Sequence, residues 1–147
     1  MNGPTDDLPA PPDDADPATV VAVGELTEAL ETTEVARGHL FAFHQLTGSA
    51  DFKLESAIEK LEEAGHGEFA ARLRRELLGR NVLPGRWTFQ VVEDYEETYY
   101  EPFKALERAG RDLVGGRPHL YEADLKRRRR SAGEPGHEAT PSDLSSG

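Results

Sequence analysis

Residues 80–114 read RNVLPGRWTFQVVEDYEETYYEPFKALERAGRDLV, and this stretch holds the clearest helical pattern in the chain. Large apolar side chains recur at helical intervals at Val92, Tyr95, Tyr99, Phe103, Leu106 and Leu113. This spacing places them on one face of a helix over about 88–114. Pro102 falls inside the pattern. Because proline lacks an N–H and clashes with the preceding turn, we predict a kink or break near Thr98.

Shorter apolar repeats predict the other helices. The first is expected over about 18–46, with Asp16 as N-cap, Pro17 in the first turn and Gly48 as the stop. The second is expected over about 50–64, with Ser49 as N-cap and Gly65 as the stop. Two more are expected over about 67–78, which stops at Gly79, and about 118–128. No alternating run of strand length accompanies them, apart from the brief segment 88–92. The sequence therefore predicts an all-α fold, an up-down bundle of four helices, two long and two short, with a short C-terminal helix.

The ends of the chain differ in composition from its middle. Residues 1–17 contain five Asp and five Pro, and the chain beyond residue 131 is again poor in large apolar residues. Such segments bury too little apolar surface to offset the entropy of ordering. We expect a disordered acidic tail over 1–17, a helical bundle domain over 18–126, and a basic and then polar disordered tail over 127–147.

Charge and composition exclude several classes of protein. The net charge of −11 argues against a broad nucleic-acid surface. The basic residues are concentrated in one short run at 126–130, beside an acidic domain, so we predict no sequence-specific nucleic-acid binding. The chain has no cysteine, so disulfides, thiolate zinc sites and thiol nucleophiles are excluded. No apolar run approaches the ~20 residues of a membrane helix, and the acidic start is unlike a secretory signal. We expect a cytoplasmic protein without membrane contact.

Charged residues within the apolar stripes form the first candidate site. Arg37 and His44 lie two turns apart on one face of the first helix, and Glu96 falls beside Tyr99 on the fourth. A buried guanidinium needs a carboxylate, so we predict an Arg37–Glu96 ion pair bordered by His44 and Tyr99. The favoured interpretation is a polar cluster that fixes helix register. The alternative is a pocket for a small polar ligand.

A metal-binding or enzymatic bundle is a second alternative. Suitable ligand types occur at Glu34, His44, Glu96, His119 and Glu122. Di-iron bundles use a Glu-x-x-His pair on each of two helices, and these five residues contain no such pair. Neither the ligand count nor the spacing of a metal centre is met, so we expect no metal and no cofactor.

The connector before the last long helix allows two interpretations. Pro84-Gly85 predicts a tight turn, and Trp87 is expected to plug the end of the bundle, with Arg80 and Asn81 as donors to the preceding helix end. Alternatively, Arg80, Arg86 and Trp87 form a partner-binding hot spot, because these residue types dominate interface energies. We favour the plug, since a lone Trp in a small domain is usually part of the core.

Three segments carry a resemblance to known proteins: EVARGHLFAFHQ at 34–45, the block at 80–100, and GGRPH at 115–119. With thirteen Arg against four Lys and one Ile, the chain resembles conserved small proteins of unknown function from high-GC actinobacteria. The resemblance spans about residues 26–130. It implies a helical fold and a cytoplasmic setting, and no activity.

These observations favour a small helical bundle that acts through contacts with a protein partner or a small polar ligand, without catalysis. A homo-oligomer is among the arrangements allowed. The runner-up is a metal-binding or enzymatic bundle that uses the interhelical Glu, Arg, His and Tyr cluster.

Overall fold

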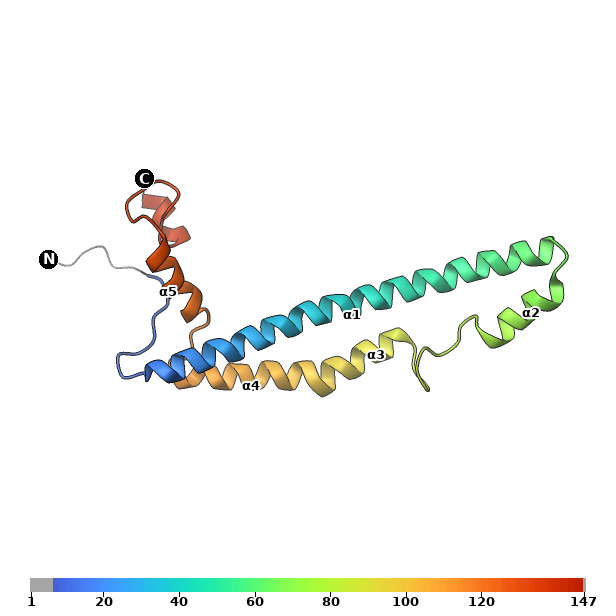
Figure 1. Ribbon diagram of the computed structural model, residues 1–147, viewed down its shortest axis with the longest axis horizontal. Helices are drawn as coiled ribbons and strands as arrows, with labels where there is room; N and C mark the ends of the chain where they lie inside the picture. The colour runs from blue at the N-terminus through green and yellow to red at the C-terminus, as the bar shows by residue number, and fades with distance from the viewer. Residues whose placement is uncertain (1–6, 147) are drawn as a thin grey trace. The chain divides into compact units, whose positions relative to one another are not determined.

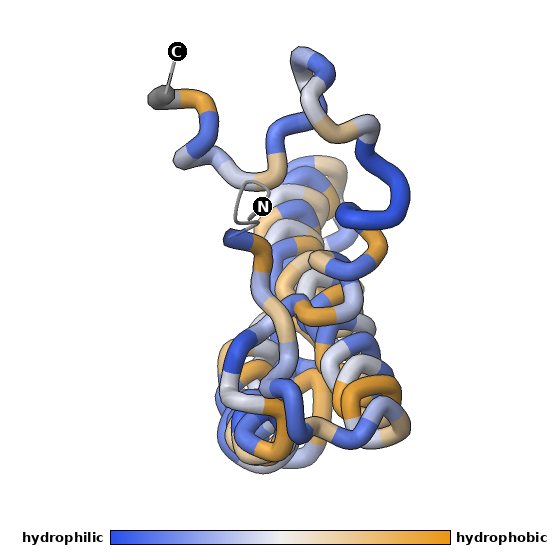
Figure 2. The backbone as a smooth tube through the Cα atoms, turned by 90° about the vertical axis from the view of Figure 1, so that its left-hand side faces the viewer, coloured by the Kyte–Doolittle hydropathy of each residue, from blue (hydrophilic) through white to orange (hydrophobic). Residues whose placement is uncertain are grey.

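A computed structural model describes residues 7–146 of the chain, and it confirms the all-α helical class (Figure 1). Within this described range the only pairing of strand type is one isolated bridge between Leu83 and Arg86. Hydrophobic and hydrophilic residues alternate along the helices, as amphipathic packing requires (Figure 2). The first six residues of the predicted tail 1–17, and Gly147 of the predicted tail 127–147, lie outside the described residues.

The first helix, α1, runs without interruption from Pro17 to Glu63. Its start agrees with the prediction: Asp16 Oδ1 accepts a hydrogen bond from the Ala18 N–H at 3.3 Å, and Pro17 occupies the first turn. The predicted stop at Gly48 and the predicted cap at Ser49 are wrong, because the helix continues through both residues. The two helices expected over 18–46 and 50–64 are therefore one.

The behaviour of the glycines explains this difference. An interior glycine costs a helix only about 1 kcal/mol relative to alanine, and the fully buried Ile58 anchors the part of the helix that follows Gly48. A glycine ends a helix when it adopts a positive φ. Gly65 does so at +89°, and the N–H of His66 donates to Leu61 O at 2.8 Å in a Schellman motif. The end predicted at Gly65 is confirmed.

The next elements are α2, Gly67–Glu76, and α3, Thr88–Tyr95, joined by the connector 77–87. Gly79, at φ +71°, lies just past the end of α2 as predicted. The tight turn at Pro84-Gly85 is also present, with the Arg86 N–H donating to Leu83 O at 3.0 Å. The segment 88–92, considered as a strand, is helical.

A single π-helical turn, η1 (Glu96–Tyr100), separates α3 from α4 (Glu101–Arg111), and the short 3-10 helix η2 (Asp112–Val114) follows. The Glu101 N–H donates to Glu96 O, five residues back. This break of the α pattern lies just before Pro102, close to where the kink was predicted.

The π turn moves the buried face of the helix by one residue. The apolar pattern predicted burial of Tyr99, Leu106 and Leu113, and all three are exposed. The buried positions are each one residue later, at Tyr100, Glu107 and Val114. A π turn holds one residue more than an α turn, so every following side chain is displaced by one position relative to a straight helix.

The chain divides into two compact units. Unit 1 consists of the chain up to Glu31 together with residues 103–147, and includes α5 (Leu120–Arg129) and the 3-10 helix η3 (Pro141–Ser146). Its core joins Val23, Val114 and Leu120. Unit 2 covers Thr32–Pro102. Its buried apolar residues are Ile58, Ala70, Val92 and Tyr100.

The predicted basic run forms the last turn of α5 and makes contacts within unit 1. Arg127 Nη2 donates to Leu8 O at 2.6 Å and to Pro9 O at 3.0 Å, and Arg128 pairs with Asp124 at 3.0 Å. Part of the basic charge is therefore used inside the chain. Among the described residues, no helix is both long and apolar enough to span a bilayer.

Candidate functional site

The predicted Arg37–Glu96 ion pair forms inside unit 2. Arg37 Nη2 lies 2.6 Å from Glu96 Oε1, and Arg37 Nε donates to the same oxygen at 2.9 Å. The guanidinium carbon is 4.5 Å from the centroid of the Tyr100 ring and 5.0 Å from that of Phe41. The arginine is thus held by one carboxylate and two aromatic faces, a geometry that guanidinium favours.

Tyr100 connects this pair to a second carboxylate. The buried Tyr100 hydroxyl donates to Glu34 Oε1 at 2.5 Å. This hydrogen bond, followed by burial and the negative charge of Glu34, raises the pKa of Tyr100 above its ordinary value. The pKa of Arg37 is also raised, chiefly by its hydrogen bond to Glu96, with burial acting in the opposite direction. Both groups stay in their protonated forms at neutral pH.

Two predicted neighbours of the pair are placed differently. His44 Nδ1 lies 2.6 Å from Thr88 Oγ1, so His44 joins α1 to the buried first residue of α3. Tyr99 is exposed, with its ring centroid 5.7 Å from that of Tyr95. The ring that packs on Arg37 is Tyr100, because the π turn brings the later residue to the inner face. The groups of this cluster are bonded to one another, and these bonds hold α1 against η1.

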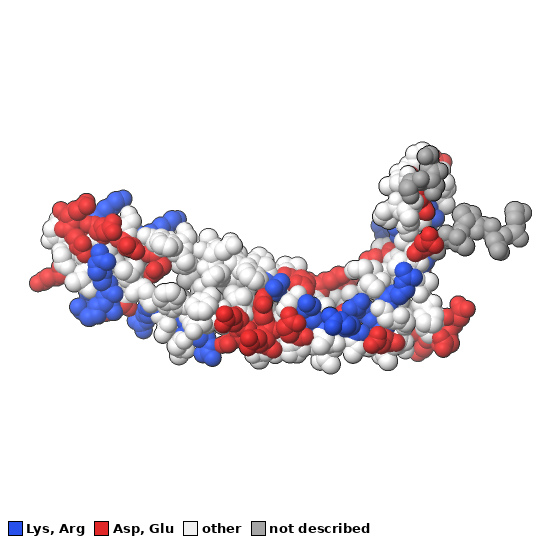
Figure 3. All heavy atoms as spheres, turned by 180° about the vertical axis from the view of Figure 1, so that it is seen from behind, with Lys and Arg blue, Asp and Glu red and all other residues white. Residues whose placement is uncertain are grey.

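A groove lies elsewhere in unit 2, between α1 and the connector. Its volume is about 480 Å³, and its apolar walls come from Phe52, Leu54, Leu77, Val82 and Trp87. Phe52 and Leu77 are exposed, and Phe52 also borders a second, shallower hollow on the α1 face. A space-filling view shows a broad region without charged atoms over this part of the molecule (Figure 3).

Trp87 lines the groove and does not plug the bundle. Its side chain is 51% exposed, so the plug interpretation is wrong. Its indole Nε1–H donates to Gly79 O at 3.0 Å, and Asp51 Oδ1 accepts from the Gly79 N–H at 3.0 Å. The backbone N–H and C=O of Gly79 thus tie the α1 wall of the groove to the Trp87 wall. The Trp87 N–H also donates to Gln90 Oε1 at 2.8 Å, which caps α3 and fixes the start of the helix.

The other connector residues of the candidate site lie around this groove. Arg80 lines it, and its Nη1 donates to Glu76 O at 3.2 Å, which confirms its predicted role as a donor to the end of α2. Asn81 is exposed in the connector. Arg86 is paired with Asp94 and donates to Pro84 O at 3.2 Å. Of the proposed hot-spot residues, Arg80 and Trp87 share the groove.

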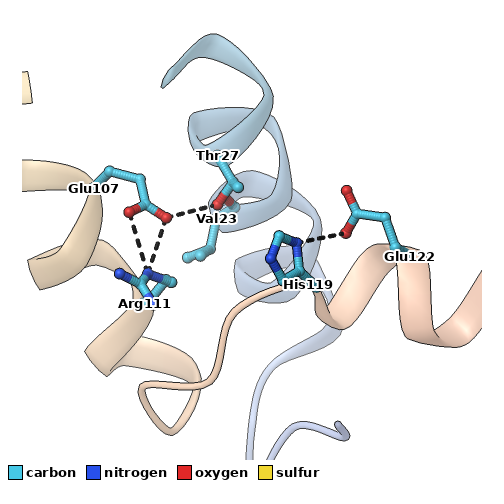
Figure 4. Close-up of polar contacts among 6 residues, drawn as sticks. All are labelled: Val23, Thr27, Glu107, Arg111, His119 and Glu122. Atoms are coloured by element: carbon cyan, nitrogen blue, oxygen red, sulfur yellow. Dashed lines mark hydrogen bonds and ion pairs between the residues drawn. The ribbon is translucent and has the colours of Figure 1, made fainter. Parts of the chain in front are cut away.

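Unit 1 contains a buried carboxylate that the sequence did not single out. Glu107 is 4% exposed; its carboxylate accepts from Thr27 Oγ1 at 3.0 Å and lies 2.9 Å from Arg111 Nε (Figure 4). Arg111 lies on α4 itself and Thr27 on α1, so the bond to Thr27 makes this cluster a structural link between α1 and α4.

The ligand types considered for a metal centre are distributed among other contacts. Glu34 is bonded to Tyr100, Glu96 to Arg37 and His44 to Thr88. His119 and Glu122 meet Glu31, with their ligand atoms within 4.8 Å of one another. All three residues are exposed, and His119 Nδ1 lies 3.9 Å from Glu122 Oε2. Such a group is typical of a solvated charged surface.

Sequence reasoning missed the residues that shape the groove on α1. Phe52, whose exposure of 77% is the highest among the large apolar residues that the structure describes, was not singled out, and Gly48, which lines the groove, was expected only to end a helix. One signal was available: residues 38–50 contain no Asp, Glu, Lys or Arg. When a helix segment of thirteen residues is exposed in the single chain and carries no charge, this indicates a surface that another molecule covers.

Comparisons of the chain with protein-family models, curated proteins and solved structures found no match.

Proposed function

We propose that this protein is an interaction module that works by binding another polypeptide through the groove between α1 and the connector, without catalysis. The exposed apolar lining of the groove supports this proposal most directly. Phe52, Leu77, Val82 and Trp87 meet at one concave surface and remain accessible. Aromatic residues in a concave apolar patch are the usual anchors of protein interfaces.

The distribution of exposed apolar residues gives a second line of support. Unit 2 has twelve exposed large apolar side chains and four buried apolar ones. Nine of the exposed ones lie in 41–52 and 77–89: Phe41, Phe43, Leu46, Phe52, Leu77, Val82, Leu83, Trp87 and Phe89. Large contiguous apolar patches on soluble proteins mark binding surfaces.

The polar cluster supports the same proposal by its chemistry. Arg37 is satisfied by Glu96, and the Tyr100 hydroxyl by Glu34. A catalytic group needs a reactive atom that can reach a substrate. Here the donors and acceptors are used to hold the helices together, which suits a rigid scaffold for a binding surface.

A small apolar ligand is a second candidate occupant of the groove. The volume of about 480 Å³ falls within the range of small-molecule sites. Asp51 and Arg80 add one acidic and one basic side chain to the apolar lining. A ligand of this kind would combine an apolar body with a polar end. We expect this binding role to be exercised in the cytoplasm.

An apolar dye tests whether the groove binds at all. Trp87 is the only tryptophan, so quenching of its emission by the dye ANS reports binding beside it. We expect ANS to quench the dilute protein, and Phe52→Glu to weaken this binding about tenfold, an effect of about 1.4 kcal/mol. Leu106→Glu is the matched control, since Leu106 is 68% exposed on a helix outside the groove. Equal binding by both variants would exclude the groove as the binding surface.

A further inference from the structure

We infer that α4 exists in two helical registers, the π register of the structure and a minor α register in which η1 closes as an ordinary α turn. The change rotates α4 by one residue position about its axis, and so exchanges the side chains on its inner face. The inference goes beyond the proposed function, because it concerns α4 and not the groove. It rests on the sequence of this helix, which supplies a suitable inner face in either register.

Each buried residue of the helix follows a residue that can replace it. In the π register the buried positions are Tyr100, Glu107 and Val114. The residues directly before them are Tyr99, Leu106 and Leu113, all of which are exposed. An α turn holds one residue fewer than a π turn, so these three would take the inner places in the α register. The α register therefore buries more apolar surface than the π register.

Exchange of Tyr100 for Tyr99 conserves the chemistry of the first inner position. The Tyr100 hydroxyl donates to Glu34 Oε1 at 2.5 Å, and its ring centroid lies 4.5 Å from the guanidinium carbon of Arg37. Tyr99 has the same ring and the same hydroxyl, so it supplies both contacts in the α register. Glu34 and Arg37 keep an aromatic partner in either register.

The second inner position can exchange without leaving a buried polar group unpaired. Glu107 accepts from Thr27 Oγ1 at 3.0 Å and pairs with Arg111, four residues later on the same helix (Figure 4). Rotation of α4 would carry Glu107 and Arg111 towards solvent together, so their ion pair persists. The Thr27 hydroxyl has a second acceptor, Val23 O, at 3.1 Å. Leu106 would then lie where a charge is now buried.

Two glycines after α4 can absorb the rotation. The 3-10 helix η2 follows α4, and Gly115 and Gly116 come next with φ values of +91° and +79°. Because glycine accepts a wide range of backbone angles, this loop can take up the residue that leaves the turn. Val114 would move from the core of unit 1 into the loop, and Leu113 would replace it beside Val23.

Two local costs hold α4 in the π register. In an uninterrupted α-helix the ring of Pro102 would clash with the carbonyl of Thr98, and Pro102 has no N–H to donate to it. Ala109 would also take the place of Gly110, where a Cβ would lie 2.7 Å from Leu26 Cδ2. These costs oppose the gain in apolar burial, and opposed preferences give a major and a minor state. In the minor state, unit 1 withdraws two leucines from solvent and presents a carboxylate.

Thiol labelling of the full chain reports the register. The chain has no cysteine, so Val114→Cys and Leu113→Cys each introduce one thiol. Val114 is 1% exposed and Leu113 is 69% exposed, so the π register protects the first thiol and exposes the second. Pro102→Ala removes the clash, and we expect the α register to become the major state. Labelling of the Val114→Cys thiol by iodoacetamide should then become at least about fivefold faster, since a minor state is populated to at most about 10%. Labelling of the Leu113→Cys thiol should become at least about twofold slower.

Leu106→Lys tests the minor state in the chain that retains Pro102. A lysine at position 106 stays in solvent in the π register, and it would be buried in the α register. We therefore expect Leu106→Lys to slow labelling of the Val114→Cys thiol at least about tenfold, the effect of burying an unpaired charge. Ala105→Lys is the matched control, because position 105 is exposed and stays on the outer side in both registers. It should leave the labelling rate unchanged.

The direction of the changes separates rotation from loosening of the helix. A general loosening would speed labelling at both 113 and 114, and this result in Pro102→Ala would overturn the inference. A Val114→Cys thiol that stays protected in Pro102→Ala would also overturn it, as would equal labelling rates in Leu106→Lys and Ala105→Lys. Circular dichroism verifies that each variant is folded. If Pro102→Ala does not fold, the comparison of the two lysine variants decides alone.

Discussion

The buried carboxylate of Glu107 leads to an asymmetric prediction. Glu107 is almost fully buried, whereas its partner Arg111 keeps about a fifth of its side chain, 21%, exposed to water. Glu107→Leu leaves an arginine that can turn towards solvent, so we expect a loss of about 2 kcal/mol, the value of a charged hydrogen bond. Arg111→Met leaves a buried carboxylate with Thr27 as its remaining partner in the link, and we expect a loss of about 3–5 kcal/mol.

Urea unfolding followed by circular dichroism measures both losses at neutral pH. In a thermal scan the arginine variant should melt about 10 °C below the wild type, at roughly 3 °C per kcal/mol for a chain of this size. The double variant Glu107→Leu with Arg111→Met should recover to within about 1 kcal/mol of the wild type, because no charge is left buried alone. A larger loss for Glu107→Leu than for Arg111→Met, or additive losses in the double variant, would refute the reasoning.

Two further predictions concern single positions. Gly38→Ala should raise the free energy of unfolding by up to about 1 kcal/mol, because its Cβ would meet no atom within 4 Å. Gly110→Ala should gain less, since its Cβ would lie 2.7 Å from Leu26 Cδ2. Equal gains of the two variants in urea unfolding would contradict this. The raised pKa of Tyr100 stabilises the fold at pH values below the ordinary tyrosine pKa of about 10, and this contribution is lost as pH rises through the higher folded value. Tyr100→Phe should therefore unfold with a weaker alkaline pH dependence than the wild type, and Tyr99→Phe should behave like the wild type; identical profiles for the two variants would contradict the assignment.

The helix ends show which part of the fold the sequence could predict. Asp16 and Gly65 act through bonds to residues at most five positions away, so local chemistry identifies them. Gly48 is a glycine like Gly65, but packing holds the helix segments on both sides of Gly48 in place. Whether a glycine ends a helix depends on the surrounding contacts, which the local sequence does not contain.

The candidate site was predictable to a similar degree. The Arg37–Glu96 pair could be predicted because a charge on an apolar face requires a partner. The exposure of Trp87 could not be predicted, because it depends on which elements pack over the end of the helices. The identity of the aromatic residue on Arg37 depended on the π turn, and a constant 100° per residue places Tyr99 there in error.

The π turn at Glu96–Tyr100 also makes this helix tolerant of one change in chain length. It holds one residue more than an α turn, so deletion of a single residue from it would leave enough chain to complete an ordinary α-helix. The side chains after the deletion would keep their faces, with Glu107 and Val114 still on the inner side. Conversion of the π turn to an α turn without a deletion would instead rotate Leu106 and Leu113 inward. The turn therefore takes up one extra residue without changing which side chains of α4 are buried.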